Sequence, residues 1–168
     1  ESGARTFGSL TIASGGTYNA TSGTTTLGDG KSDLIFDDSN SGTFTHNGGT
    51  LTFYNLAGTS RINAGNTYNA VILNSSGDIL HTNSAFACES LTLTAGTWNT
   101  EVQGGGADQT LTVAGIVTNN ATLTANASAL SVGGIRNTGT YTGTGTITLT
   151  GTGGILEGNL DDAIINVN

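Results

Sequence analysis

The sequence contains no proline, no methionine and only one cysteine. A single cysteine excludes a disulfide within the chain. Cys88 follows Phe86 and Ala87, so we expect it to be a small buried hydrophobic residue. No apolar run is as long as a transmembrane helix, and no signal-peptide pattern is present. We therefore expect no insertion into a membrane.

Basic residues are also scarce. Only four of the 168 residues are lysine or arginine, and the formal net charge is -8. No basic stripe is present to neutralise phosphates, so we expect no nucleic-acid partner. Charged residues make up only 10% of the chain. Intrinsic disorder usually needs a higher charge and fewer β-branched residues, so we expect an ordered chain.

Glycine is abundant, with 27 residues, and threonine, serine and asparagine fill short alternating runs. No stretch has helical periodicity over three turns, so the sequence predicts an all-β fold. Two architectures fit this pattern: a β-solenoid of stacked short strands, and a β-sandwich or jelly roll. Internal repetition, the lack of proline and the Gly/Asn corners favour the β-solenoid, with coils of about twenty residues.

The chain repeats parts of itself. Ser90–Asn99 echoes Ser9–Asn19, and Thr118–Thr124 echoes Thr45–Thr52. We therefore expect a lead-in over residues 1–8 and one repetitive domain over residues 9–168, with approximate repeats 9–89 and 90–168. A Thr-aromatic-Asn-like signature occurs four times, and in each we expect the aromatic ring in the core and the asparagine at a corner. Its copies begin at Thr17, Phe53, Thr67 and Thr97.

The sequence also predicts the local structure of three segments. Every second residue from Thr138 to Thr152 is threonine, and the intervening glycines divide this run into strands at Thr140–Thr142 and Thr146–Thr150. Ser75–Cys88 is less regular and predicts a loop. Residues Asp29–Asn40 are either an excursion from the repeat or a strand with an acidic rim.

Catalytic chemistry finds little support in the sequence. The carboxylate pairs Asp37/Asp38 and Asp161/Asp162 are adjacent in the chain, and adjacent residues of a strand point to opposite faces. The two histidines, His46 and His81, lie in no pattern that indicates a catalytic triad. We expect a protein that is not an enzyme.

Asp29, Asp33 and Asp37 form the one candidate metal site. Calcium prefers several oxygen ligands, which an acidic loop can supply. The EF-hand spacing is absent, and a solvated acidic turn is the alternative interpretation. Calcium is the only cofactor that the sequence indicates.

Pairs of threonines at i and i+2 occur at Thr24/Thr26, Thr50/Thr52, Thr92/Thr94, Thr110/Thr112 and Thr122/Thr124. Such rows on a flat solenoid face resemble the ice-binding surfaces of antifreeze proteins. The resemblance implies ice binding if the pairs stand in register on one face. Threonine is also simply a common solvent-facing residue of strands.

The segments Gly42–Phe53, Thr67–Leu73 and Ser90–Thr97 resemble the degenerate repeats of bacterial surface adhesins and of structural proteins of environmental phages. The resemblance implies a β-solenoid that serves as a shaft, spacer, decoration or adhesive surface. We expect a non-enzymatic structural or adhesive protein, extracellular on a cell surface or on a virion surface. Its expected partners are copies of itself, other structural subunits or a surface glycan. The alternative is a carbohydrate-binding module with an exposed aromatic residue, Tyr54 or Tyr141.

A solenoid end leaves strand edges unpaired, which must be capped or joined to a neighbour. The last apolar run of the chain is a candidate for such a joint, with its assembly residues Ala163, Ile164, Ile165 and Val167. We hypothesise that removal of this run abolishes assembly.

Overall fold

The computed structural model describes residues 2–39, 41–151, 154–160 and 163–167, which form strands and no helix. The chain is an all-β solenoid of parallel strands. The strands are β1 (Arg5–Phe7), β2 (Leu10–Thr11), β3 (Thr17–Asn19), β4 (Thr24–Leu27), β5 (Leu34–Asp37), β6 (Thr43–Thr45), β7 (Thr50–Tyr54), β8 (Thr59–Asn63), β9 (Thr67–Thr82), β10 (Phe86–Asn99), β11 (Leu111–Asn119), β12 (Thr122–Asn126), β13 (Leu130–Asn137), β14 (Thr140–Gly143), β15 (Thr146–Leu149), β16 (Leu156–Glu157) and β17 (Ile164–Val167).

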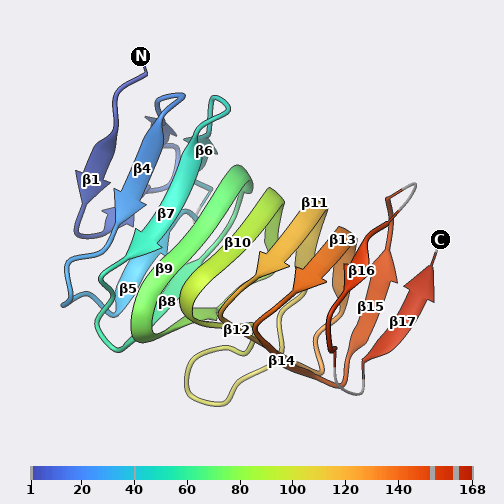
Figure 1. Ribbon diagram of the computed structural model, residues 1–168. Coiled ribbons are helices and arrows are strands. Elements are labelled where there is room, and N and C mark those ends of the chain that lie inside the picture. Colours follow the sequence, from blue (N-terminus) through green and yellow to red (C-terminus); the bar gives the residue numbers. More distant parts are fainter. Residues whose placement is uncertain (1, 40, 152–153, 161–162, 168) are drawn as a thin grey trace.

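The strands stack in parallel along three sides, which we call faces A, B and C (Figure 1). Face A contains β1, β4, β7, the middle of β9 and β10, the second halves of β11 and β13, and β16. Face B contains β2, β5, β8, the ends of β9 and β10, β12 and β14. Face C consists of two ladders, one of β3 and β6 and one of the starts of β9, β10, β11 and β13 followed by β15 and β17. A contact between the Phe44 and Tyr68 rings joins the two ladders. Each circuit through the faces is one rung.

Register along face A fixes the size of a rung. A rung has about 18 to 26 residues, the scale of known repeat units, because the aligned positions of successive rungs are Thr25, Leu51, Val71, Leu91, Val117 and Ile135. The longer rungs carry loops at the corners, at residues 28–33 and 100–110. The strands themselves keep their register past these loops.

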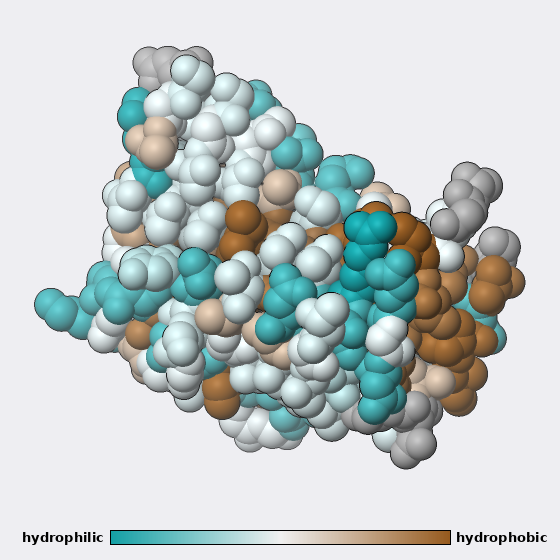
Figure 2. Space-filling model, viewed as in Figure 1, coloured by the Kyte–Doolittle hydropathy of each residue, from teal (hydrophilic) through white to brown (hydrophobic). Residues whose placement is uncertain are grey.

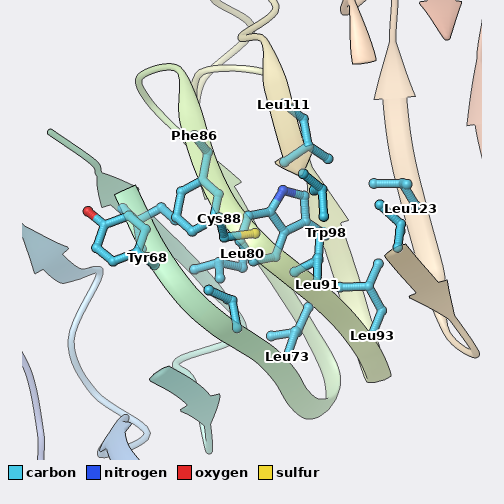
Figure 3. Close-up of a cluster of buried hydrophobic side chains, with 14 of the residues drawn as sticks. Tyr68, Leu73, Leu80, Phe86, Cys88, Leu91, Leu93, Trp98, Leu111 and Leu123 are labelled. Carbon is cyan, nitrogen blue, oxygen red and sulfur yellow. The ribbon is translucent and has the colours of Figure 1, made fainter. Parts of the chain in front are cut away.

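Alternation along each strand places one residue inside and the next outside. The inward residues stack in columns, such as Leu51, Val71, Leu91, Val117 and Ile135, each no more than 2% exposed. Aromatic rings fill the wider parts of the interior: the ring centroids of Phe86 and Trp98 lie 4.9 Å apart, and those of Phe86 and Tyr68 lie 5.0 Å apart (Figure 3). The core is therefore a continuous row of apolar layers along the solenoid axis.

Corners depend on residues that tolerate a positive φ. Asn47, Asn55 and Asn126 have φ of 49°, 52° and 49°, in the left-handed region that asparagine adopts more readily than most residues. Gly28 has a φ of 144°, and a Cβ there would lie 1.6 Å from the carbonyl oxygen of Tyr54 in the next rung. Only glycine lets the two backbones approach this closely.

Two predictions from the sequence are wrong in detail. Arg5–Phe7, expected within a lead-in, forms β1, the first strand of face A. Ser75–Cys88, expected to carry a loop, is mostly strand: β9 continues to Thr82 and β10 begins at Phe86, so the loop is limited to residues 83–85. These strands bend around corners made of Asn, Ser and Gly, which resemble loop residues in the sequence.

The echo within the chain does not mark equivalent positions. Leu10 pairs with Phe36 on face B, whereas its counterpart Leu91 pairs with Val71 and Val117 on face A. The rung is the structural repeat. The expected division of the threonine run is confirmed by β14 and β15, which lie on faces B and C.

Trp98 is the only tryptophan of the chain and is fully buried, and its indole Nε1 has no hydrogen-bond partner among the residues that the structure describes. We expect Trp98→Ala to lower the free energy of unfolding by about 3–5 kcal/mol, because a large ring leaves the core. Trp98→Phe should cost clearly less, since it keeps most of the ring and removes an unpaired donor. Denaturant titration followed by circular dichroism measures both variants. Equal losses would contradict this account of the core.

Candidate functional site at the two ends of the solenoid

The three aspartates of the candidate metal site do not converge. Asp29 Oδ1 accepts hydrogen bonds from the backbone N–H groups of Ser32 and Lys31, both at 2.8 Å. These bonds lower the pKa of Asp29, and the bond from Ser32 has the larger effect. Asp33 Oδ2 lies 2.6 Å from Arg61 Nη1. Within the described residues, no three His, Cys, Asp or Glu side chains are grouped as metal ligands. The arrangement gives the calcium prediction no support.

Asp37 and Asp38 point to different environments, as adjacent strand residues do. The Asp37 carboxylate accepts from the backbone and hydroxyl of Ser39, whereas Asp38 is 1% exposed. Asp38 accepts hydrogen bonds from Gly65 N at 2.5 Å, Asn66 Nδ2 at 2.8 Å and the Tyr68 hydroxyl at 2.8 Å. Burial raises the pKa of Asp38, although these donors oppose the shift. This carboxylate links successive rungs.

The remaining catalytic candidates are spread over the molecule. His46 Nδ1 accepts from Gly48 N at 3.0 Å, within its own turn. His81 Nδ1 lies 2.8 Å from the carbonyl oxygen of Glu101, on the other side of a corner. Asp161 and Asp162 lie outside the described residues. A narrow gap lined by Phe44, Leu51 and Tyr68, among others, has no room for a water molecule.

Threonine pairs lie on all three faces rather than on one. Thr24/Thr26 and Thr50/Thr52 stand in register on face A, but the next rung has Ala70 and Ile72 at these positions. Thr110/Thr112 lie at face C and Thr122/Thr124 on face B. Thr92 lies in the same row as Thr26 and Thr52, beyond Ile72, whereas Thr94 lies outside this row. A continuous two-row threonine surface is therefore limited to two adjacent rungs.

The two aromatic candidates for glycan binding differ in exposure. Tyr54, at the end of β7, is 54% exposed, whereas Tyr141 is 3% exposed. The expectation that Tyr141 is exposed is wrong, because Thr140 and Thr142 occupy the outward positions of β14 and Tyr141 lies between them. Tyr54 is the one that reaches solvent.

The predicted assembly residues lie at the C-terminal end of the stack. Ile164, Ile165 and Val167 belong to β17, which pairs with β15 and with no other described strand, while Ala163 packs against the core just before it. Val167 is 76% exposed although Leu149, its neighbour in the same inward column, is 3% exposed. Leu156, on β16, is similarly uncovered above the buried Ile135. Apolar residues gather at this end of the molecule (Figure 2).

The N-terminal end is uncovered in the same way, which the sequence did not indicate. Phe7, Leu10 and Tyr18 are partly exposed, whereas the residues that stack on them in the second rung are buried: Leu27, Phe36 and Phe44. Within the described residues, the first and last rungs therefore each leave part of the apolar core uncovered. These uncovered residues can be identified only when the register between strands of neighbouring rungs is known. No described segment is a helix long and apolar enough to span a membrane.

Cys88 should behave as an inert thiol. Burial raises its pKa to about 12, with a smaller contribution from Glu89, and the side chain is 2% exposed. The thiolate is the reactive species, so we expect no reaction of the native protein with Ellman's reagent at neutral pH, and one thiol per chain after unfolding in denaturant. Rapid reaction of the folded protein would contradict the placement of Cys88 in the core.

Asp38 should make stability depend on pH in a direction that can be measured. Burial raises the pKa of Asp38 in the folded protein. Its contribution to the free energy of unfolding is therefore fully present below the ordinary pKa of 3.8 and is lost as the pH rises through the folded pKa. Asp38→Asn removes this titration. We expect the melting temperature of the wild-type protein relative to Asp38→Asn to fall as the pH rises toward neutral. A relative rise would show that the three donors outweigh burial.

Comparison of the chain with protein-family models, with curated proteins and with solved structures found no match. What the protein does must therefore be inferred from its own residues and geometry.

Proposed function

We propose that the protein is a non-enzymatic structural shaft or spacer on the outside of a cell or virion, which displays its surfaces or joins other subunits. The observation that supports this most directly is the unbroken core. Apolar columns run through every rung from β4 to β15, and the ladders of hydrogen bonds connect each rung to the next. Such an arrangement holds two distant points of the chain at a fixed separation.

Side-chain hydrogen bonds at the corners add to this continuity. Asn119 Nδ2 donates to Asn137 Oδ1 at 2.7 Å, and Ser128 Oγ donates to Thr100 Oγ1 at 2.7 Å, both between neighbouring rungs. Buried polar groups that are paired in this way resist rearrangement, because separation would leave them without partners. Neighbouring rungs are therefore connected at these corners as well as through the ladders.

The outer surface supports display better than catalysis. Four of the aspartates are engaged within the fold: Asp29 and Asp37 bond their own turns, and Asp33 and Asp38 pair with a neighbouring rung. Extracellular placement is part of the proposal, and it is supported by the Thr- and Asn-rich, Lys-poor composition.

The two alternative functions, carbohydrate binding and ice binding, are each supported by a single feature of the surface. A carbohydrate-binding module has in its favour the exposed ring of Tyr54, which stands alone at the end of β7. Ice binding has in its favour the register of Thr24/Thr26 with Thr50/Thr52, which Ala70 and Ile72 interrupt. A shaft requires neither feature, and its rigidity can be tested directly.

Thr6 and Thr118 lie in one outward row of face A, five strand spacings apart. A spin label at each position, introduced through Thr6→Cys and Thr118→Cys, should give a backbone separation of about 24 Å, because parallel strands are ~4.8 Å apart. Double electron–electron resonance should show one narrow distance distribution. Cys88 should remain unlabelled because it is buried.

Thr26→Cys with Thr118→Cys is the matched control, since it lies in the same row and should shorten the distance by one strand spacing. Broad or multiple distances in both pairs would overturn the shaft proposal. Specific glycan binding abolished by Tyr54→Ala would instead support the carbohydrate-binding alternative.

A further inference from the structure

The turn that connects β6 to β7 contains Asn47, the only asparagine of the sequence that is followed by glycine. Asn47 and Gly48 have φ of 49° and 74°, so both central positions of the turn are left-handed. The turn is closed by Gly49 N, which donates to His46 O at 2.8 Å. Asn47 and Gly48 are exposed, and a Cβ built at Gly48 would have nothing within 4 Å. The backbone at Gly48 is therefore open to solvent.

An asparagine followed by glycine can react with its own backbone. The nitrogen of the following residue attacks the side-chain carbonyl carbon, and a glycine has no Cβ to hinder the attack. A base is needed, because a backbone amide holds its proton tightly. In this turn the base is already in place, since Gly48 N donates to His46 Nδ1 at 3.0 Å. A general base must lie within hydrogen-bond distance of the proton that it takes, and His46 meets this requirement.

Side-chain amides connect this turn to the rungs on both sides of it. Asn47 Nδ2 donates to Ala20 O of the first rung at 2.8 Å. Asn69 Nδ2, on β9, donates to Gly48 O at 2.7 Å and to Gly49 O at 3.2 Å. These bonds lie where face C is interrupted, because β6 pairs with β3 and with no other described strand. The turn therefore helps to connect β3 and β6 to the rest of the stack.

We propose that Asn47 is a self-modification site, at which His46 promotes deamidation through a succinimide and the product loosens this corner. In the first step a bond forms between Gly48 N and Asn47 Cγ, and the bond between Asn47 Cγ and Nδ2 breaks. The proton of Gly48 N passes to His46 Nδ1 and then to the leaving amine, which departs as ammonia. Water opens the ring at either carbonyl carbon and gives aspartate or isoaspartate. A shaft does not require this reaction, which adds a limited lifetime to one of its corners.

The product has a structural consequence at the same corner. A carboxylate at position 47 cannot donate to Ala20 O, so a bond between the first two rungs is lost. Isoaspartate also adds a carbon atom to the backbone, which changes the geometry of the hydrogen bond from Gly49 N to His46 O. The rungs that contain β11 and β13 make none of these contacts and keep their own.

The corner between β11 and β12 supplies a matched comparison for the base. There Ala121 N donates to Asn119 Oδ1 at 3.1 Å, the same contact between residues i+2 and i that Gly48 makes with His46. An asparagine side chain accepts this hydrogen bond but does not act as a base. His46→Asn should therefore keep the turn and remove only the basic group, and circular dichroism checks that the variant folds.

The reaction is tested on the purified protein, kept at neutral pH and physiological temperature in heavy-oxygen water. Peptide mass spectrometry that separates aspartate from isoaspartate follows the products. We expect Asn47 to be converted before any other asparagine, with isoaspartate and one heavy oxygen atom in the product. His46→Asn should slow the conversion at least about tenfold, because a positioned general base contributes roughly 10²–10⁴-fold. An equal rate in His46→Asn, or an unreacted Asn47 in the folded wild-type protein, would overturn the proposal.

Asn47→Asp tests the structural consequence without the reaction. We expect faster amide hydrogen exchange in β3 and β6 than in the wild-type protein, with unchanged exchange in β11 and β13. Asn120→Asp is the matched control, because Asn120 is exposed and its Oδ1 only accepts, from Thr138 Oγ1 at 2.7 Å, which a carboxylate also does. Exchange in β3 and β6 that is the same in both variants would refute the loosening of the corner.

Discussion

The structure depends on one constraint: each inward side chain is covered by the residue in the same column of the next rung. Few of these side chains are large, so a single rung buries too little apolar surface to be stable alone. Leu91 is buried because Val71 and Val117 lie on either side of it. The same constraint explains the partial exposure of Phe7 and Val167, which have a neighbour on one side only.

A thin core also brings polar groups close to its axis, where each needs a partner. Asp38 is the clearest case, since one buried carboxylate accepts from three donors of a neighbouring rung. Asn119 and Asn137 pair across another corner. Trp98 Nε1 is an exception, and there the packing of the indole ring against Phe86 and Phe53 outweighs one unpaired donor.

Alternating side chains were enough to predict the all-β fold and the two strands of the threonine run, because period two is a local property of the chain. The second half of β9, from Ser75 onward, was not expected as strand because its corner residues are the same types that form loops. The alternation already places Tyr141 opposite its threonine neighbours, so its burial was predictable. Asp29 and Asp37 bond residues of their own turns, which are local, whereas the pairing of Asp33 with Arg61 follows from register between rungs, which a single sequence does not contain.

The loop at residues 100–110 leaves the shaft at a corner, and β10 and β11 still pair in parallel on faces C and A, with one register shift between Cys88 and Leu91. The loop extends away from the strands (Figure 1). Gly104 and Gly105 in it are exposed, and Gln103 is bonded by Asn83 and Arg61. Lengthening such a loop adds little closure entropy. New sequence can therefore be grafted at these glycines, so the scaffold can vary what it carries without altering how it folds.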